Sequence, residues 1–159
     1  MITDTSINNL LSLKYKIQSL EWVHSVVTLL DVPLLNNSEA PLQERLKNFK
    51  TLKDEDVNKD RGFKEIISSP VFRNFVISED GKTSGIIVYL KENKPLDDIK
   101  NKSEKEIEIY KDQIKKQNHK NIIEIRDVIK SYDNIGKIHL GGIPMICLLY
   151  TSPSPRDVR

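Results

Sequence analysis

Residues 72–90 carry the clearest pattern in the chain and read FRNFVISEDGKTSGIIVYL. Two apolar-rich runs, 72–78 and 83–90, flank a polar segment at 79–82. The Asp-Gly pair in that segment supplies the positive φ angles that a tight primed turn requires. The stretch therefore predicts a β-hairpin over 72–90, in which one face is shared by Ile86, Val88 and Leu90.

The segment before the hairpin predicts a helix, a strand and two shorter helical pieces. A helical apolar stripe over 6–21 consists of Leu10, Leu13, Ile17 and Leu20. We expect Thr5 or Ser6 to cap this helix. Residues 23–30 are rich in β-branched side chains and predict a strand buried on both faces. Helical spacing recurs at Leu42, Leu46 and Phe49, and again at Phe63, Ile66 and Ile67 before Pro70.

The segment after the hairpin is dominated by charge. Of the 40 residues in 91–130, 11 are Lys or Arg and 9 are Asp or Glu. Apolar stripes run through the segment, which predicts a long, solvated, amphipathic helix at about 99–132, or two helices if residues 117–119 break it. Residues 137–140 then predict a short strand that enters Gly141-Gly142.

The predicted element order indicates an α+β fold. Helix, strand, short helix, hairpin, long helix and strand would match the β-α-β-β-α-β order of a ferredoxin-like split βαβ unit if one strand preceded the first helix. The expected fold is therefore a ferredoxin-like unit whose first strand is missing from this chain.

Composition narrows the possible functions. The chain has 159 residues, a formal net charge of +2 and one cysteine. That length favours one domain, and the charge is too small to indicate a nucleic-acid partner. No run approaches the roughly 20 apolar residues of a membrane-spanning helix. A single cysteine excludes an internal disulfide and argues against a zinc site.

The last 13 residues differ from the rest of the chain. Residues 147–159 contain Ser-Pro-Ser-Pro, which continues neither a helix nor a strand, and resemble translated sequencing-adapter sequence. We interpret 1–146 as one α+β domain and 147–159 as a non-native tail. Removing the tail takes away two Arg, one Asp and Cys147, so the net charge falls from +2 to +1.

No group of residues predicts catalysis, a cofactor site or a metal site. His24, His119 and His139 each lack a second ligand at metal-binding spacing. Ser78 and its acidic neighbours form the predicted turn rather than a catalytic relay, and Gly141-Gly142 lacks the Lys of a phosphate-binding loop. The acidic clusters at 54–56 and 97–98 lack EF-hand spacing. We therefore expect no enzymatic activity and no cofactor.

Three segments together resemble one family, the predicted RND-superfamily exporters of the MMPL type. Residues 20–33 (LEWVHSVVTLLDVP) resemble a segment of that family that ends in "SLldvP". Residues 69–83 (SPVFRNFVISEDGKT) resemble its "sPlyrnllvSeDGkt" hairpin. Residues 139–146 (HLGGIPMI) resemble the "lgGiPmi" segment that precedes its second transmembrane helix.

The resemblance implies the periplasmic porter domain between the first and second transmembrane helices of a bacterial inner-membrane protein. Such proteins export lipids or other hydrophobic compounds, driven by proton flow. The partners would then be the rest of the transporter chain and a hydrophobic substrate. The family's proton-relay residues lie in transmembrane helices that this chain does not contain. Only structural roles carry over, namely Asp80 and Gly81 in the turn and Gly142 and Pro144 in the bend toward the membrane.

A second hypothesis remains open beside the exporter. The chain would then be a free-standing soluble α+β module, in which the hairpin and the long helix form a surface for binding another protein.

Overall fold

The computed structural model describes residues 2–36, 41, 43, 49–92, 103–142 and 145. They fall into two compact units, Met1–Leu90 and Lys91–Arg159. The described residues contain helices and a two-stranded antiparallel sheet, so the predicted α+β class is confirmed. The proposed tail at 147–159 and Pro144 lie outside the described residues.

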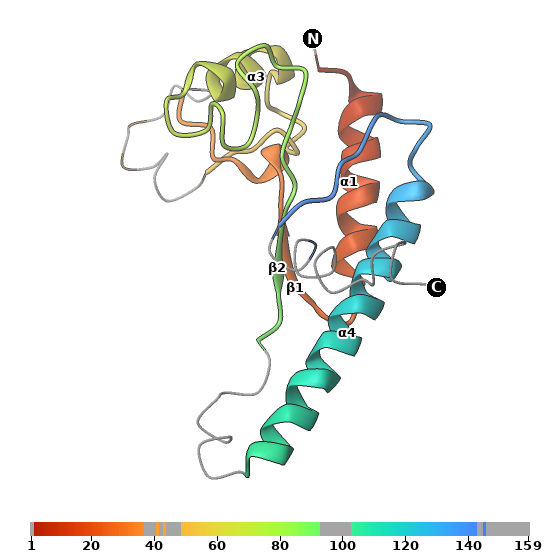
Figure 1. Cartoon of the computed structure of the whole chain (residues 1–159). Helices are drawn as coiled ribbons and strands as arrows, with labels where there is room; N and C mark the ends of the chain where they lie inside the picture. The colour runs from red at the N-terminus through yellow and green to blue at the C-terminus, as the bar shows by residue number, and fades with distance from the viewer. Residues whose placement is uncertain are drawn as a thin grey trace. The chain divides into compact units, whose positions relative to one another are not determined.

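Helix α1 (Asp4–Gln18) opens the first unit (Figure 1). Thr3 caps it, because the Thr3 side-chain oxygen accepts a hydrogen bond from the Ser6 amide at 3.1 Å. The predicted helix is confirmed, but the predicted cap is wrong. Thr5 and Ser6 lie inside the first turn, where the Ser6 amide is one of the donors that the cap satisfies.

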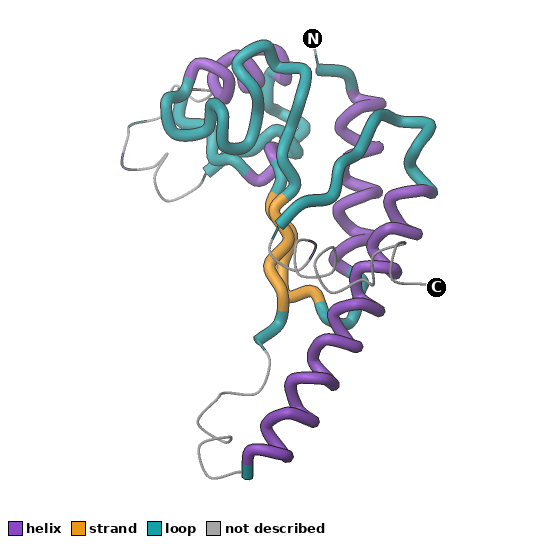
Figure 2. The backbone as a smooth tube through the Cα atoms, viewed as in Figure 1, coloured by secondary structure: helices purple, strands orange, loops and turns teal. Residues whose placement is uncertain are grey.

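Strands β1 (Val23–Val27) and β2 (Ile87–Leu90) pair as a narrow antiparallel ribbon (Figure 2). Val26 lies opposite Val88. The predicted strand over 23–30 is correct at its start and too long at its end. The backbone turns at Thr28 into a short 3₁₀-helix, η1 (Leu29–Asp31), so Leu29 and Leu30 enter the core from a helical turn.

The predicted hairpin over 72–90 is present as a turn but wrong as a pair of strands. The chain reverses between Ser78 and Thr83, where the Ser78 amide donates to the Thr83 carbonyl at 2.8 Å. Residues 72–78 make only isolated bridges, and Asn74 has a left-handed φ of 63° that interrupts extended backbone. The second half of the predicted hairpin therefore forms β2 and pairs with β1 instead.

Helix α3 (Lys59–Ser68) agrees with the predicted helical turns around Phe63. Asn58 caps it by accepting from the Arg61 amide at 3.0 Å. The helix ends before Pro70, because the residue preceding a proline is driven to extended backbone, as Ser69 is with ψ of 124°. The other predicted short helix, at 42–49, falls almost wholly outside the described residues.

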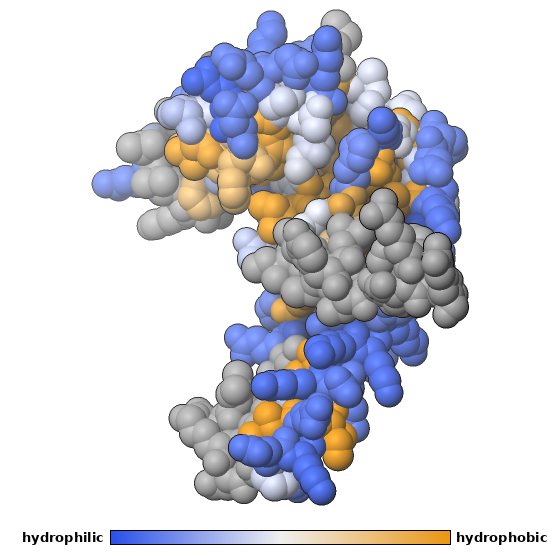
Figure 3. All heavy atoms as spheres, in the orientation of Figure 1, coloured by the Kyte–Doolittle hydropathy of each residue, from blue (hydrophilic) through white to orange (hydrophobic). Residues whose placement is uncertain are grey.

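The core of the first unit gathers described residues from α1, η1, α3 and the segments around η1 and α3. Leu30 and Leu52 are fully buried, and Ile66 on α3 is 1% exposed. The remaining buried members of this cluster are Ile7, Leu29, Val32, Leu34, Val57, Val76 and Ile77. Figure 3 shows apolar surface on the lobe that contains α3, beside hydrophilic residues. The segments on either side of α3 thus form much of the core that supports the polar site around Asp31.

The second unit is built on α4 (Glu104–Lys130), a helix about 40 Å long at 1.5 Å per residue. Ser103 and Glu106 form its capping box, in which Glu106 Oε2 accepts from the Ser103 amide at 2.9 Å. The predicted long helix is confirmed as one uninterrupted helix. Gln117, at the expected break, donates to the Asn121 side chain at 2.8 Å within the helix.

The predicted strand at 137–140 is wrong. These residues are irregular, and the described residues 103–142 of this unit hold no strand with which they could pair. Gly142 has a φ of 110°, a conformation that glycine adopts readily. Within the described part of the chain, no helix is both long and apolar enough to cross a membrane.

Candidate functional site

The sequence offers several candidate residues for metal or acid–base chemistry, and those in the described part of the chain form no metal-binding group. His24, His119 and His139 are all exposed, on β1, on α4 and beyond α4. In the acidic cluster at 54–56, Asp54 accepts from the Thr51 amide and Asp56 pairs with Lys50. Residues 97–98 lie outside the described residues. Among those described, no group of three or more His, Cys, Asp or Glu side chains could hold a metal ion.

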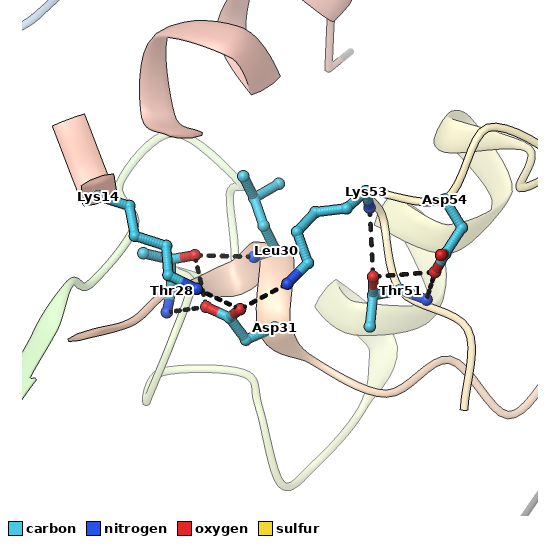
Figure 4. A network of polar contacts seen from close by, with 7 residues as sticks. All are labelled: Lys14, Thr28, Leu30, Asp31, Thr51, Lys53 and Asp54. Carbon is cyan, nitrogen blue, oxygen red and sulfur yellow. Dashed lines mark hydrogen bonds and ion pairs between the residues drawn. The ribbon is translucent and has the colours of Figure 1, made fainter. Parts of the chain in front are cut away.

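A network of polar contacts in the first unit surrounds Asp31 (Figure 4). Asp31 Oδ1 accepts from Lys14 Nζ of α1 at 2.5 Å and from Lys53 Nζ at 2.8 Å. Its Oδ2 accepts from the Thr28 amide at 2.8 Å and from the Thr28 hydroxyl at 3.0 Å. Thr28 Oγ1 in turn accepts from the Leu30 amide at 3.2 Å. One carboxylate therefore joins α1, η1 and the loop that contains Lys53.

The same local motif occurs on both sides of this network. Thr28 and Asp31 form a capping box at η1. Thr51 and Asp54 have the same spacing of three residues. Asp54 Oδ2 accepts from the Thr51 amide at 2.6 Å and from the Thr51 hydroxyl at 3.0 Å. Lys53 lies inside the second motif and donates to the carboxylate of the first. Two Thr-x-x-Asp turns are thus tied together by one lysine.

The environment of Asp31 favours its ionised form. Burial opposes ionisation, but hydrogen bonds from Lys14, Lys53 and Thr28 together outweigh it and hold the pKa of Asp31 well below its usual range. A carboxylate with such a low pKa is a weak base, and both its oxygens already have donors. The arrangement can hold the fold together and is unsuited to taking a proton from a substrate.

The turn at 78–83 uses the polar residues that the resemblance singled out. Ser78 Oγ donates to Asp80 Oδ1 at 2.6 Å, and that oxygen also accepts from the Lys82 amide at 3.1 Å. These bonds lower the pKa of Asp80. Of the Asp-Gly pair, only Gly81 has a positive φ, at 68°. The primed turn with two positive φ angles was therefore the wrong turn type, since the Asp80 side chain fixes the backbone instead.

Replacing Gly81 with alanine is expected to lower the free energy of unfolding by about 1–2 kcal/mol, the cost of a left-handed φ for a residue with a Cβ. The new Cβ would also lie 2.9 Å from Ile67 Cδ1, which must move. Urea unfolding followed by the fluorescence of Trp22 measures the change. Gly136→Ala is the control, because its Cβ would meet no atom of the described residues within 4 Å. Equal effects of the two substitutions would contradict this role of Gly81.

A cavity of about 320 Å³ lies beside the C-terminal half of α3. Its lining is mostly apolar with several polar groups: Val32, Pro33, Leu35, Asn36, Glu65, Ile66, Ser68, Ser69, Pro70 and Phe72. Glu65 Oε1 accepts from the amides of Leu35 and Asn36, at 2.6 and 3.0 Å. Glu65 Oε2 is buried and has no hydrogen-bond partner among the described residues. Sequence reasoning missed Glu65, because nothing local marks a partner thirty residues earlier in the chain.

Comparisons with known proteins find no match for the chain among protein-family models, curated proteins or solved structures.

Proposed function

We propose that the chain is the porter-type domain of a proton-driven RND-superfamily exporter of the MMPL type. This domain would stand on the periplasmic side of a bacterial inner membrane, between the first two transmembrane helices. The whole transporter would export lipids or other hydrophobic compounds. The observation that carries the proposal is that three segments that resemble the family's motifs occur in the family's order, at 20–33, 69–83 and 139–146.

The contacts of the first two segments support the proposal. Leu30 and Val32 of the first segment and Val76 and Ile77 of the second belong to one hydrophobic cluster. The polar motif residues also have specific geometric roles, since Asp31 joins three parts of the unit and Ser78 and Asp80 build a turn around Gly81.

The element order offers a second line of support. Helix α1, strand β1, strand β2 and helix α4 follow one another as helix, strand, strand, helix, and the two strands are antiparallel. That is the order of the inner four elements of a split βαβ unit. In this interpretation, residues 28–86 form an insertion between the two strands. The ferredoxin-like porter subdomain remains our proposal for the finer fold.

The native reading frame on both sides of the chain tests the assignment. An exporter requires about 20 consecutive apolar residues within a few positions after Ile146, and another apolar helix upstream of Thr5. It also requires that the sequence of 147–159 be replaced by native sequence. A stop codon soon after Ile146, together with a ribosome-binding site ahead of Met1, would refute the proposal.

If the reading frame extends as expected, transport is the functional test. The full-length protein, expressed in bacteria that lack their main efflux pumps, should lower the accumulation of a hydrophobic fluorescent dye. A protonophore should abolish that difference, because proton flow drives the export. Cells with the empty vector provide the baseline, and accumulation equal to that baseline for a range of dyes and lipid analogues would count against export.

The alternative, a free-standing protein-interaction module, has one observation in its favour. On α4, Ile109 is 58% exposed and Ile123 is 46% exposed, which leaves two apolar side chains available for a contact with another protein. The irregular structure of 72–78 removes half of the surface that this hypothesis assigned to a hairpin. The reading-frame test distinguishes the two functions, because only the module would end shortly after Ile146.

A further inference from the structure

We propose that the cavity beside Glu65 binds a small molecule that combines an apolar body with a protonated amine. The cavity lies entirely within the first unit and is formed by the chain around residue 33, the C-terminal half of α3 and the segment that follows it. Its volume of about 320 Å³ is at the lower end of the range of natural ligand sites. The proposal is independent of the exporter assignment.

The walls of the cavity determine the apolar part of the ligand. Pro33, Pro70 and Phe72 line it together with aliphatic side chains of the core. Such a lining favours a flat or compact hydrocarbon body over a sugar or a nucleotide, whose many polar groups would lose their hydration. Four of the ten lining residues are polar, which suits a ligand that combines an apolar body with one polar end.

Glu65 determines the charged part of the ligand. The two backbone amides on Oε1 are neutral donors, and no described residue forms an ion pair with this carboxylate. A buried acceptor without a donor is destabilising, and more so if it is charged. An ammonium group supplies both the missing donor and the missing positive charge, whereas a carboxylic acid or phosphate would add repulsion.

The carboxylate can meet such a ligand with a small movement. Oε2 is shielded from solvent, so the ammonium must approach as the carboxyl group turns about its last side-chain bond. That torsion of glutamate is broad and soft. The neighbouring amides of Leu35 and Asn36 stay close to Oε1 during a small turn, and their chemical environment must therefore change when the ligand binds.

Phenethylamine is a suitable probe, with 2-phenylethanol as its neutral counterpart and phenylacetic acid as its anionic counterpart. Each is titrated into the ¹⁵N-labelled chain, and amide shifts are followed by NMR. We expect the amine to bind with a Kd of about 0.1–1 mM, as its small size allows. The alcohol should bind at least tenfold more weakly, and the acid should not bind. The largest shifts should include the amides of Leu35 and Asn36.

Glu65→Gln separates charge from shape. The glutamine oxygen can still accept from Leu35 and Asn36, so the fold is preserved, but the negative charge is lost. Amine binding should fall at least tenfold while binding of the alcohol is unchanged. Glu55→Gln is the matched control, since Glu55 is exposed and does not line the cavity, and it should bind the amine like the wild type.

Three results would overturn the proposal. The first is equal binding of amine and alcohol by the wild type, and the second is no shift near the cavity at millimolar amine. The third is undiminished amine binding by Glu65→Gln. If that variant fails to fold, the comparison of the three probes on the wild-type chain decides by itself. None of these results depends on whether the parent protein transports anything.

Discussion

Replacing Leu30 with alanine is expected to lower the free energy of unfolding by about 3 kcal/mol. Leu30 is fully buried at the centre of the cluster that Leu52 and Ile66 also enter. Truncating it removes apolar contacts and leaves a cavity that a close-packed core fills only in part. For a unit of about 90 residues, a loss of this size lowers Tm by roughly 12–24 °C. Urea unfolding followed by the fluorescence of Trp22 gives the free energy directly.

Leu90→Ala is the matched control for this substitution. It removes the same atoms from a side chain that is 43% exposed at the end of β2. Its effect should stay below about 1 kcal/mol, because nearly half of the Leu90 surface already faces water, whereas Leu30 is fully buried. If the two substitutions cost the same, Leu30 does not occupy the centre of the core.

The turn around Gly81 was predictable because its signal is local. Ser78 donates to Asp80, and the side chains of Asp80 and Ser78 accept from the amides of Lys82 and Thr83, all within six residues. The sequence alone therefore locates the reversal. The pairing of the following strand was not predictable in this way. β2 is far from β1 in the chain, and the apolar pattern of 83–90 fits any neighbouring strand equally well.

The end of β1 did carry a signal that the strand prediction overlooked. Thr28-Leu29-Leu30-Asp31 has the Thr-x-x-Asp spacing of a capping box. The run of β-branched and apolar residues favours a strand up to Leu30, but the side-chain bonds of Thr28 and Asp31 favour a helical turn. The capping bonds prevail because Leu29 and Leu30 reach the core from η1 as well as they would from a strand.

The partners of Asp31 and Glu65 could not be predicted, because they come from distant segments. Lys14 lies beside the apolar stripe of α1, where its aliphatic stem is buried while its ammonium reaches Asp31. Lys53 and the amides of Leu35 and Asn36 are brought to their acids only by the packing of loops around α3. The α+β class follows from local patterns, whereas these sites follow from the tertiary fold.

Replacing Asp31 with asparagine is expected to destabilise the first unit by about 2–3 kcal/mol. Asparagine has one acceptor oxygen, so its amide group must face either Lys14 Nζ or the donors of Thr28. The side chains of Lys14 and Asp31 are only 11% and 19% exposed, and breaking a buried pair leaves a charge without compensation. Asp56→Asn is the control, because the pair of Asp56 with Lys50 is largely exposed, and its effect should be much smaller. Similar losses in urea unfolding for both variants would contradict the structural role of Asp31.

Lowering the pH should reduce the stability advantage of the wild type over Asp31→Asn. The pKa of Asp31 is lowered in the folded chain, against an ordinary value of 3.8. Its contribution to stability is therefore complete above that value and is lost as the pH falls below it toward the folded pKa. Asp56 and Asp80 also have lowered pKa values, so both the wild type and Asp31→Asn weaken in acid, but the difference between the two proteins isolates Asp31.

The gap in unfolding free energy between wild type and Asp31→Asn should be constant from about pH 7 to about pH 5. Below about pH 4 the gap should narrow by at most about 1.4 kcal/mol per pH unit. In this range Asp31 is ionised in the folded chain and protonated in the unfolded chain, so unfolding binds one proton. Urea unfolding of both proteins across this pH range measures the gap. A gap that stays constant down to about pH 2.5 would mean that the pKa of Asp31 is the same in the folded and unfolded chains, and the network in Figure 4 would then contribute nothing through its charge.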